Sequence, residues 1–163
     1  MIDKTLTLGY NGDVLLINNL SILGGVYMDI LVNSLRSRNC KITPQRIAVY
    51  HAIRGNRDHP NAETIYKILS PTYPTISLAT IYKSLELFVE LGLVQLINIG
   101  ENSFRYDCNT ECHPHLICTS CQKIIDLDNE FFQHLSKKVE NLTNYNISDQ
   151  QICFYGTCPE CLS

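Results

Sequence analysis

The stretch Cys112–Asp126, "CHPHLICTSCQKIID", places two histidines, three cysteines and an aspartate within fifteen residues. Side chains alternate between the two faces of a strand, so an extended segment points His113 and His115 to one side and Cys118 to the other. Cys118 and Cys121 form a Cys-x2-Cys pair, which can grip one metal ion with both sulfurs. The histidines and the cysteine pair are therefore expected to serve two different metals.

A second Cys-x2-Cys pair, Cys158 and Cys161, lies near the C-terminus. Two such pairs in one chain indicate zinc, because four thiolates form a closed, tetrahedral, structural site. A redox-active Cys-x-x-Cys is the alternative, and it accounts less well for two pairs. We predict one structural Zn2+ that contributes folding energy to this half of the chain. Its predicted ligands are Cys118, Cys121, Cys158 and Cys161.

The second metal site has five nitrogen and oxygen donors as candidates. Imidazole and carboxylate ligands suit Fe2+, Mn2+ or Zn2+ better than Cu(I). A His-x-His pair alone is more commonly a pair of surface histidines, but an aspartate on a neighbouring predicted strand strengthens the metal interpretation. One candidate lies in the first half, so a metal that it helped to bind would couple the two halves. The candidates are His59, Asp107, His113, His115 and Asp126.

Composition indicates a globular chain of one or two small domains. The 163 residues are 45% hydrophobic, and no uninterrupted apolar run reaches the roughly 18 residues of a membrane span. Residues 1–27 lack the features of a signal peptide, so we expect a cytoplasmic protein with reduced thiols. We also expect residues 1–27 to be a non-native or disordered extension, with Met28 as a candidate start.

Charge is distributed unevenly along the chain, whose net charge is -3. Residues 28–100 carry a net charge of +3, whereas residues 101–163 carry -5. This division fits a first part that meets phosphates and a second part that binds cations. Ordinary surface variation is the alternative explanation.

Residues 28–107 show the order of a winged-helix DNA-binding domain with its hinge. Three helical patterns precede two short apolar runs around a polar turn, which predict a hairpin. The third helix exposes hydrogen-bonding side chains and an aromatic ring near its start, as a recognition helix requires, although a solvated face is the alternative. The helices are expected to begin at Pro44, near Asn61 and after Ser77, the last ending at Gly92. The candidate DNA contacts are Arg46, Arg57, Thr80, Tyr82 and Lys83.

Residues 108–163 predict a metal-binding α/β domain, so the whole chain is expected to be α+β. The predicted elements are strands at 113–118 and 123–127, a helix at 128–142 and a last strand within 147–158.

Six motifs that occur in order over about residues 30–161 resemble the ferric uptake regulator (Fur) family. Within that family the chain is most similar to the peroxide-sensing repressor (PerR) branch, since aspartates stand at 107 and 126 where iron-uptake members typically carry glutamate. The motifs are "TPQR", "HPNAETIY", "SLATIYKSLELFVELGLV", "FRYD", "HPHLICTSCQKIID" and "YGTCPEC".

The resemblance implies a homodimer with N-terminal winged-helix DNA-binding domains and C-terminal α/β dimerisation domains. It implies the four-cysteine zinc site, one Zn2+ per subunit, and matches Tyr82 to the family's recognition-helix tyrosine. It also implies one Fe2+ or Mn2+ per subunit at a regulatory site. The residues that match that site are His59, Asp107, His113, His115 and Asp126.

These features predict a metal-dependent bacterial repressor that binds a palindromic double-stranded operator. Five protein ligands leave one position on Fe2+ for hydrogen peroxide, the signal, and the resemblance implies that His59 or His113 is then oxidised and the operator released. We expect no membrane association, no enzymatic activity and no other small-molecule substrate. The alternatives are an iron-uptake or zinc-uptake repressor of this family. A non-heme iron enzyme is a further alternative that leaves the helical half unexplained.

Overall fold

The computed structural model describes residues 28–54, 56–100, 103–128, 132 and 134–162, so the expected extension at 1–27 lies outside the described residues. The chain divides into two compact units between Cys40 and Lys41. In the first unit, a helix over residues 28–37 ends where Asn39 adopts a left-handed φ of 53° and the Cys40 N–H donates to Leu35 O. The domain boundary predicted after residue 107 stays a prediction.

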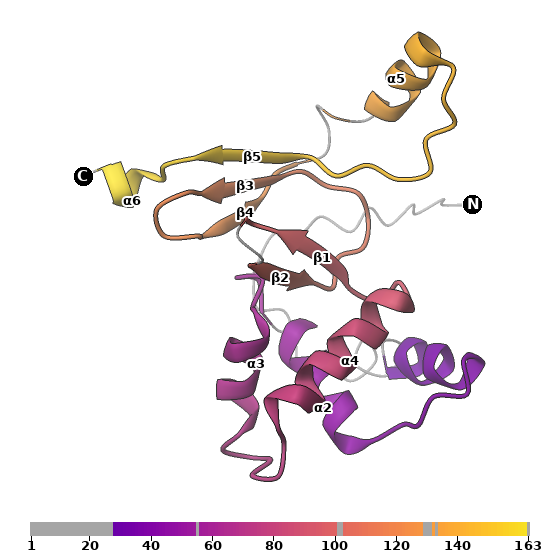
Figure 1. The fold of residues 1–163 in the computed structure, drawn as a ribbon, viewed down its shortest axis with the longest axis vertical. Coiled ribbons are helices and arrows are strands. Elements are labelled where there is room, and N and C mark those ends of the chain that lie inside the picture. The colour runs from indigo at the N-terminus through magenta and orange to yellow at the C-terminus, as the bar shows by residue number, and fades with distance from the viewer. Residues whose placement is uncertain (1–27, 55, 101–102, 129–131, 133, 163) are drawn as a thin grey trace, which may run out of the picture. The chain divides into compact units, whose positions relative to one another are not determined.

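The second unit begins with three helices whose ends agree with the sequence signals (Figure 1). The Asn61 side chain accepts from the Thr64 N–H at 2.8 Å, and Ser77 Oγ accepts from the Thr80 N–H at 3.2 Å, so both residues act as N-caps. The third helix is followed by Gly92 with a φ of 67°, the left-handed conformation that ends many helices. The helices are α2 (Pro44–Arg54), α3 (Ala62–Leu69) and α4 (Leu78–Glu90).

A β-hairpin follows the helices and completes the winged-helix order. Strands β1 (Gln95–Asn98) and β2 (Phe104–Asp107) pair antiparallel, which confirms the predicted hairpin. Their register sets Gln95 directly opposite Asp107, at the end of the hairpin away from its turn.

A second, three-stranded sheet has the order β4-β3-β5. The central strand β3 (His115–Cys118) runs antiparallel to β4 (Ile124–Asp126) and parallel to β5 (Cys153–Gly156). Strand β3 starts two residues later than predicted because Pro114 has no N–H to contribute to a ladder. The register places His115 directly opposite Asp126.

Two helices accompany this sheet, α5 (Leu135–Thr143) and α6 (Pro159–Leu162). The predicted helix at 128–142 began too early, since His134 adopts a left-handed φ of 69° immediately before α5 and interrupts any continuous helix from Asp128. Residues 129–131 and 133 of that prediction lie outside the described residues.

Apolar side chains connect the hairpin to the second sheet. Within the helical part, Tyr50 packs edge-on against the fully buried Phe88, with ring centroids 5.5 Å apart. Ile97 of β1 forms a separate cluster with Ile117 of β3 and Ile124 of β4, and all three are buried. This cluster holds the end of β2 beside β3 and β4, where the candidate metal ligands lie. In the part of the chain that the structure describes, no helix is long and apolar enough to cross a bilayer.

Candidate metal centres and recognition helix

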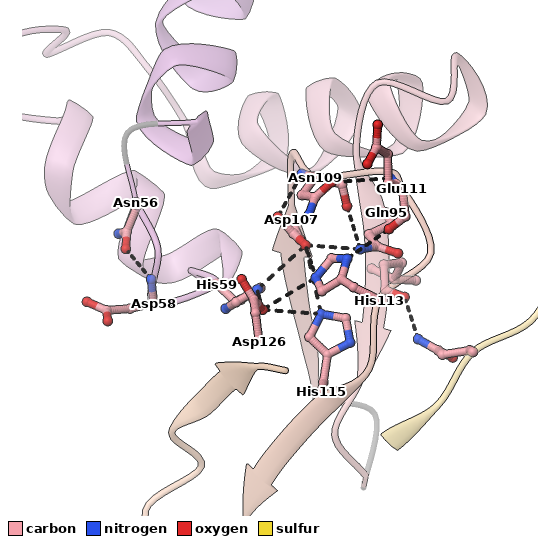
Figure 2. A network of polar contacts seen from close by, with 12 residues as sticks. Asn56, Asp58, His59, Gln95, Asp107, Asn109, Glu111, His113, His115 and Asp126 are labelled. Atoms are coloured by element: carbon pink, nitrogen blue, oxygen red, sulfur yellow. Dashed lines mark hydrogen bonds and ion pairs between the residues drawn. The ribbon is translucent and has the colours of Figure 1, made fainter. Parts of the chain in front are cut away.

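Three imidazoles and two carboxylates converge where the hairpin meets the second sheet (Figure 2). Each of the five predicted residues offers one ligand atom, and these atoms all lie within 4.8 Å of one another. The loop before α3 supplies one residue and the end of β2 supplies a second. The segment just before β3, the first residue of β3 and the last residue of β4 supply the other three. The residues are His59, Asp107, His113, His115 and Asp126.

One oxygen of each carboxylate lies close to all three histidine side chains. Oδ1 of Asp126 lies 2.8 Å from His59 Nε2, 3.4 Å from His113 Nε2 and 3.6 Å from His115 Nε2. Oδ2 of Asp107 lies 3.6, 3.2 and 3.8 Å from the same three nitrogens. Ligands about 2.1 Å from an ion are roughly 3.0 Å apart when adjacent. The observed spacings therefore fit a single small divalent cation.

The buried ring nitrogens support this fit. His59 and His115 are 2% and 1% exposed. Among the described residues, Nε2 of His113 and Nε2 of His115 have no hydrogen-bond partner of good geometry. Leaving such polar atoms buried and unpaired is costly, and a metal ion that accepts both lone pairs removes that cost.

Protonation of the cluster opposes metal binding. Burial lowers the pKa of His59, but contacts with Asp107 and Asp126 outweigh it and raise the pKa to about 9. The same carboxylates, Asp107 first, raise the pKa of His113 to about 10. Burial raises the pKa of each carboxyl, and the histidines more than reverse this, holding both pKa values below their usual range. A metal must therefore displace protons from the imidazoles.

Further hydrogen bonds orient two of the candidate ligands. His113 Nδ1 lies 2.8 Å from Glu111 O, so an Nδ1–H donor leaves the Nε2 lone pair directed into the cluster. Asp107 Oδ1 accepts from the Asn109 N–H at 2.8 Å, while Oδ2 accepts from Gln95 Nε2 at 3.0 Å. Sequence reasoning missed Gln95. The predicted hairpin offered the signal, because its register sets Gln95 directly opposite Asp107.

The position of His59 depends on the hairpin as well as on its own loop. The residue has a left-handed φ of 48°, which is uncommon outside glycine. The Tyr106 N–H of β2 donates to the carbonyl of Pro60 at 3.2 Å, immediately after this residue. A β2 backbone contact thus holds the strained loop beside Asp107.

The four predicted zinc cysteines form the second cluster, with all sulfurs within 4.8 Å of one another. The sulfurs of Cys121 and Cys158 are 3.8 Å apart, and a tetrahedral ion with Zn–S bonds of about 2.3 Å sets its sulfurs roughly 3.8 Å apart. All eight cysteines of the chain fall among the described residues, and none of them forms a disulfide. The spacing fits zinc and is too long for a disulfide.

The electrostatics of this cluster also favour a cation. Backbone hydrogen bonds from Cys121 and Cys158 lower the pKa of Cys118 to about 6. The backbone nitrogen of Cys158 donates to Cys118 Sγ at 3.3 Å. Interactions with the neighbouring sulfurs of Cys158 and Cys121 raise the pKa of Cys161 to about 12. One thiolate forms readily, whereas four adjacent thiolates require a positive ion between them.

The predicted DNA contacts lie in α2, between α2 and α3, and in α4. Tyr82 remains 38% exposed and its hydroxyl donates to Glu63 Oε1 at 2.7 Å, while Lys83 and Arg57 are exposed. The Thr80 hydroxyl lies 2.9 Å from Ser77 Oγ, so it takes part in the helix cap. The guanidinium of Arg46 donates to the Lys41 carbonyl. Three of the five candidates thus belong to α4, and the two arginines belong to α2 and to the segment between α2 and α3.

Residues 37–155 match the model of the ferric uptake regulator family. The chain belongs to the ferric uptake regulator family. The peroxide-responsive repressor PerR of Staphylococcus aureus is 37% identical over 130 residues, which are 80% of this chain and 88% of that protein. As a Fur-family member the chain is a metal-responsive transcriptional regulator, and its relatives are not enzymes.

Solved structures agree with this assignment. The Campylobacter jejuni peroxide stress regulator is 30% identical, with a TM-score of 0.65 over 82% of this chain and 98% of that chain. The Helicobacter pylori ferric uptake regulator, described as having three functional metal-binding sites, is 21% identical and shows the shared fold. Its TM-score is 0.72 over 88% of this chain and 93% of that chain. The fold is thus the α+β fold of the Fur family, with helices and a hairpin in winged-helix order followed by a second sheet, and its four-cysteine cluster fits structural zinc.

Proposed function

We propose that this protein is a cytoplasmic, peroxide-responsive repressor that binds a palindromic operator as a homodimer. In this proposal the operator is bound while a divalent metal fills the histidine and aspartate cluster, and it is released when peroxide oxidises His59 or His113. The observation that carries the proposal is the convergence of three imidazole nitrogens and two carboxylate oxygens from both halves of the chain. Similarity to peroxide-responsive regulators supports the choice of signal.

The two clusters are assigned to different ions. Four thiolates suit a structural Zn2+, one per subunit, at Cys118, Cys121, Cys158 and Cys161. The mixed nitrogen and oxygen set suits Fe2+ or Mn2+, one per subunit. These assignments rest on the donor types and on the spacing of the donor atoms.

A regulatory metal held by residues of both halves would keep the winged helix against the second sheet. His59 belongs to the loop before α3, whereas His115 and Asp126 belong to the second sheet. An ion that binds all of them favours one placement of α4 and therefore one spacing of the two recognition helices in a dimer. Metal and DNA affinities are then linked reciprocally.

The sensing chemistry depends on which groups surround the ion. An Fe2+ ion held by these residues would donate one electron to hydrogen peroxide, giving hydroxide and a short-lived oxidant, and would regain an electron as the oxidant adds to an imidazole carbon. The net products would be the oxidised imidazole and water. His59 and His113 hold ring atoms against the two carboxylates, so they are among the nearest oxidisable groups. An imidazole that gains one oxygen atom is a poor ligand, so the contact between the two halves is lost and the operator is released.

Exposed apolar side chains on the second sheet support dimerisation through this half. Leu116, Ile125 and Phe154 are 38%, 45% and 41% exposed, and they are direct neighbours across β4, β3 and β5. A row of large apolar side chains at adjacent positions is typical of a surface that a partner covers. A second copy related by a twofold axis also matches a palindromic operator.

DNA binding is assigned to α4 and to two arginines in and after α2. Thr80, Tyr82 and Lys83 are proposed to meet the major groove, while Arg46 and Arg57 meet phosphates. The net charge of +3 over residues 28–100 supports this placement.

The test compares Fe2+-loaded and Mn2+-loaded dimers before and after mild hydrogen peroxide. We expect operator affinity to fall in the Fe2+ form alone, and peptide mass spectrometry to find one added oxygen on the His59 or His113 peptide. Disulfides at Cys118 and Cys121, formed equally with Mn2+, would instead indicate a thiol switch. An Fe2+ form that stays bound and unmodified would identify an iron-uptake repressor.

Replacement of His59 tests the coupling of the two halves. His59→Ala is expected to keep the zinc and the dimer, because neither depends on this side chain, and to abolish stimulation of DNA binding by Mn2+. Operator affinity is measured by fluorescence anisotropy with and without Mn2+. The wild-type protein is the control, and equal affinity of the wild type in both conditions contradicts metal-dependent closure.

A further inference from the structure

The hydroxyl group of the candidate recognition tyrosine is held by a carboxylate from the neighbouring helix. Tyr82 Oη donates to Glu63 Oε1 at 2.7 Å. Glu63 lies in the first turn of α3 and Tyr82 lies near the start of α4. Tyr82 remains 38% exposed, so the contact fixes the hydroxyl group of a side chain that is partly accessible to solvent.

The proton of this hydrogen bond stays on the phenol. The bond to Tyr82 is the main cause that lowers the pKa of Glu63, and the same bond raises the pKa of Tyr82 to about 12. The charges of Arg105 and Lys67 also lower the pKa of Glu63, and its place at a helix N-terminus stabilises an anion. At neutral pH, Glu63 is therefore a charged acceptor and Tyr82 a neutral donor.

A phenol has only one O–H, so a committed proton changes what Tyr82 presents outward. With the proton directed to Glu63, the side chain offers oxygen lone pairs and the edge of its ring. In the major groove, guanine shows acceptors alone, whereas adenine shows an amino donor beside its N7 acceptor, cytosine shows an amino donor, and thymine shows a methyl group beside its O4 acceptor. Lone pairs facing guanine find no donor, but the ring can contact a methyl group and the oxygen can accept from an amine.

We propose that Glu63 is a positioning residue that sets the base preference of Tyr82, so that Tyr82 favours thymine, adenine or cytosine and rejects guanine. The inference rests on the proposed binding of operator DNA through α4. A purely structural role for the same contact, as a link between α3 and α4, would affect stability and leave base preference unchanged.

The experiment uses the Mn2+-loaded dimer and duplexes selected by the wild-type protein from a palindromic library. Positions whose preference changes in Tyr82→Ala identify the bases that Tyr82 reads. At these positions we expect replacement of the preferred base by guanine to lower the affinity of the wild type about tenfold, and this ratio of affinities is called the guanine cost. In Glu63→Ala this cost should fall to about threefold or less, since the freed O–H can donate to guanine. Replacing thymine by uracil, which removes only the methyl group, should cost about fourfold in the wild type.

Two variants separate hydrogen bonding from charge. Glu63→Gln keeps an accepting oxygen without the charge, and it should preserve the guanine cost of the wild type. Glu63→Ser is a second short variant at this exposed position, and it should behave like Glu63→Ala. Each result is expressed as the ratio of affinities for two duplexes of equal length, because loss of a negative charge strengthens binding to all DNA alike. Zinc content and thermal unfolding confirm that each variant is folded.

The outcomes distinguish this inference from the proposed function. In the Tyr82→Phe background, Glu63→Ala should have no further effect on the guanine cost, because no phenolic proton remains to be directed. A guanine cost that is unchanged in Glu63→Ala, or that falls equally in the Tyr82→Phe background, overturns the inference alone. If Tyr82→Ala changes no base preference, the recognition-helix assignment fails, and this inference fails with it.

Discussion

Gln95 should control the affinity of the regulatory site although it is not a predicted ligand. Its Nε2 donates to Asp107 Oδ2 at 3.0 Å and to the carbonyl of Asn109 at 2.6 Å. The Asn109 N–H in turn donates to Asp107 Oδ1 at 2.8 Å. Gln95→Ala therefore removes one direct contact to the carboxylate and loosens the loop that supplies the other.

The expected magnitude follows from these contacts. A hydrogen bond to a charged group contributes about 1.5–3 kcal/mol, and loss of a residue that orients a metal ligand commonly weakens metal binding about 10- to 100-fold. We expect Gln95→Ala to raise the free Mn2+ concentration at half-maximal operator binding by about that factor. Operator affinity at saturating Mn2+ should be unchanged, because Gln95 does not alter the closed form itself.

The assay titrates Mn2+ into the zinc-loaded dimer while the anisotropy of a labelled operator is followed. Gln151→Ala is the matched control, since that glutamine donates to the backbone of β1 at Leu96 O, 3.3 Å away, and is not among the contacts of Asp107. The control should remain within about twofold of the wild type. A Gln95→Ala midpoint within twofold of the wild type would falsify the idea that this side chain orients Asp107.

Three further predictions concern the zinc site, the signal and the core. Cys158→Ser should lose both the zinc and the dimer, as measured by metal analysis and gel filtration, whereas Cys40→Ser should keep them; retention of one zinc per subunit in Cys158→Ser contradicts the four-cysteine site. Asp126→Glu should keep Fe2+-dependent operator binding and lose peroxide sensitivity, because the longer arm chelates differently and hinders peroxide; release at wild-type peroxide doses would oppose this. Ile97→Ala should lower the free energy of unfolding by about 2–5 kcal/mol in denaturant titrations, since the side chain is fully buried against Ile117; a loss below about 1 kcal/mol argues against the shared cluster.

Features that depend on a few neighbouring residues could be predicted from the sequence. The helix starts near Asn61 and after Ser77 and the end at Gly92 were predicted correctly, because a helix end depends on contacts between residues two to four apart. The hairpin and the pairing of β3 with β4 follow from short apolar runs around turns. Ligand types and the spacing within each Cys-x2-Cys pair likewise indicated two metal sites.

Local signals failed where backbone conformation departed from the side-chain pattern. Apolar periodicity extended the predicted helix at 128–142 toward Asp128. The structure begins α5 only at Leu135, because His134 has a left-handed backbone conformation. That conformation leaves no trace in hydrophobic spacing, because periodicity records which face is apolar and not where the helix begins.

Tertiary structure alone decided which distant residues meet. His59 and Asp126 approach to 2.8 Å because Ile97 packs the hairpin on the second sheet and the Tyr106 N–H holds the carbonyl of Pro60. Sequence reasoning named both residues as candidate ligands, but their distance depends on strand register and on side-chain packing between elements. The contact between Tyr82 and Glu63 has the same origin, since only the packing of α4 on α3 brings a phenol and a carboxylate from separate helices within hydrogen-bonding distance.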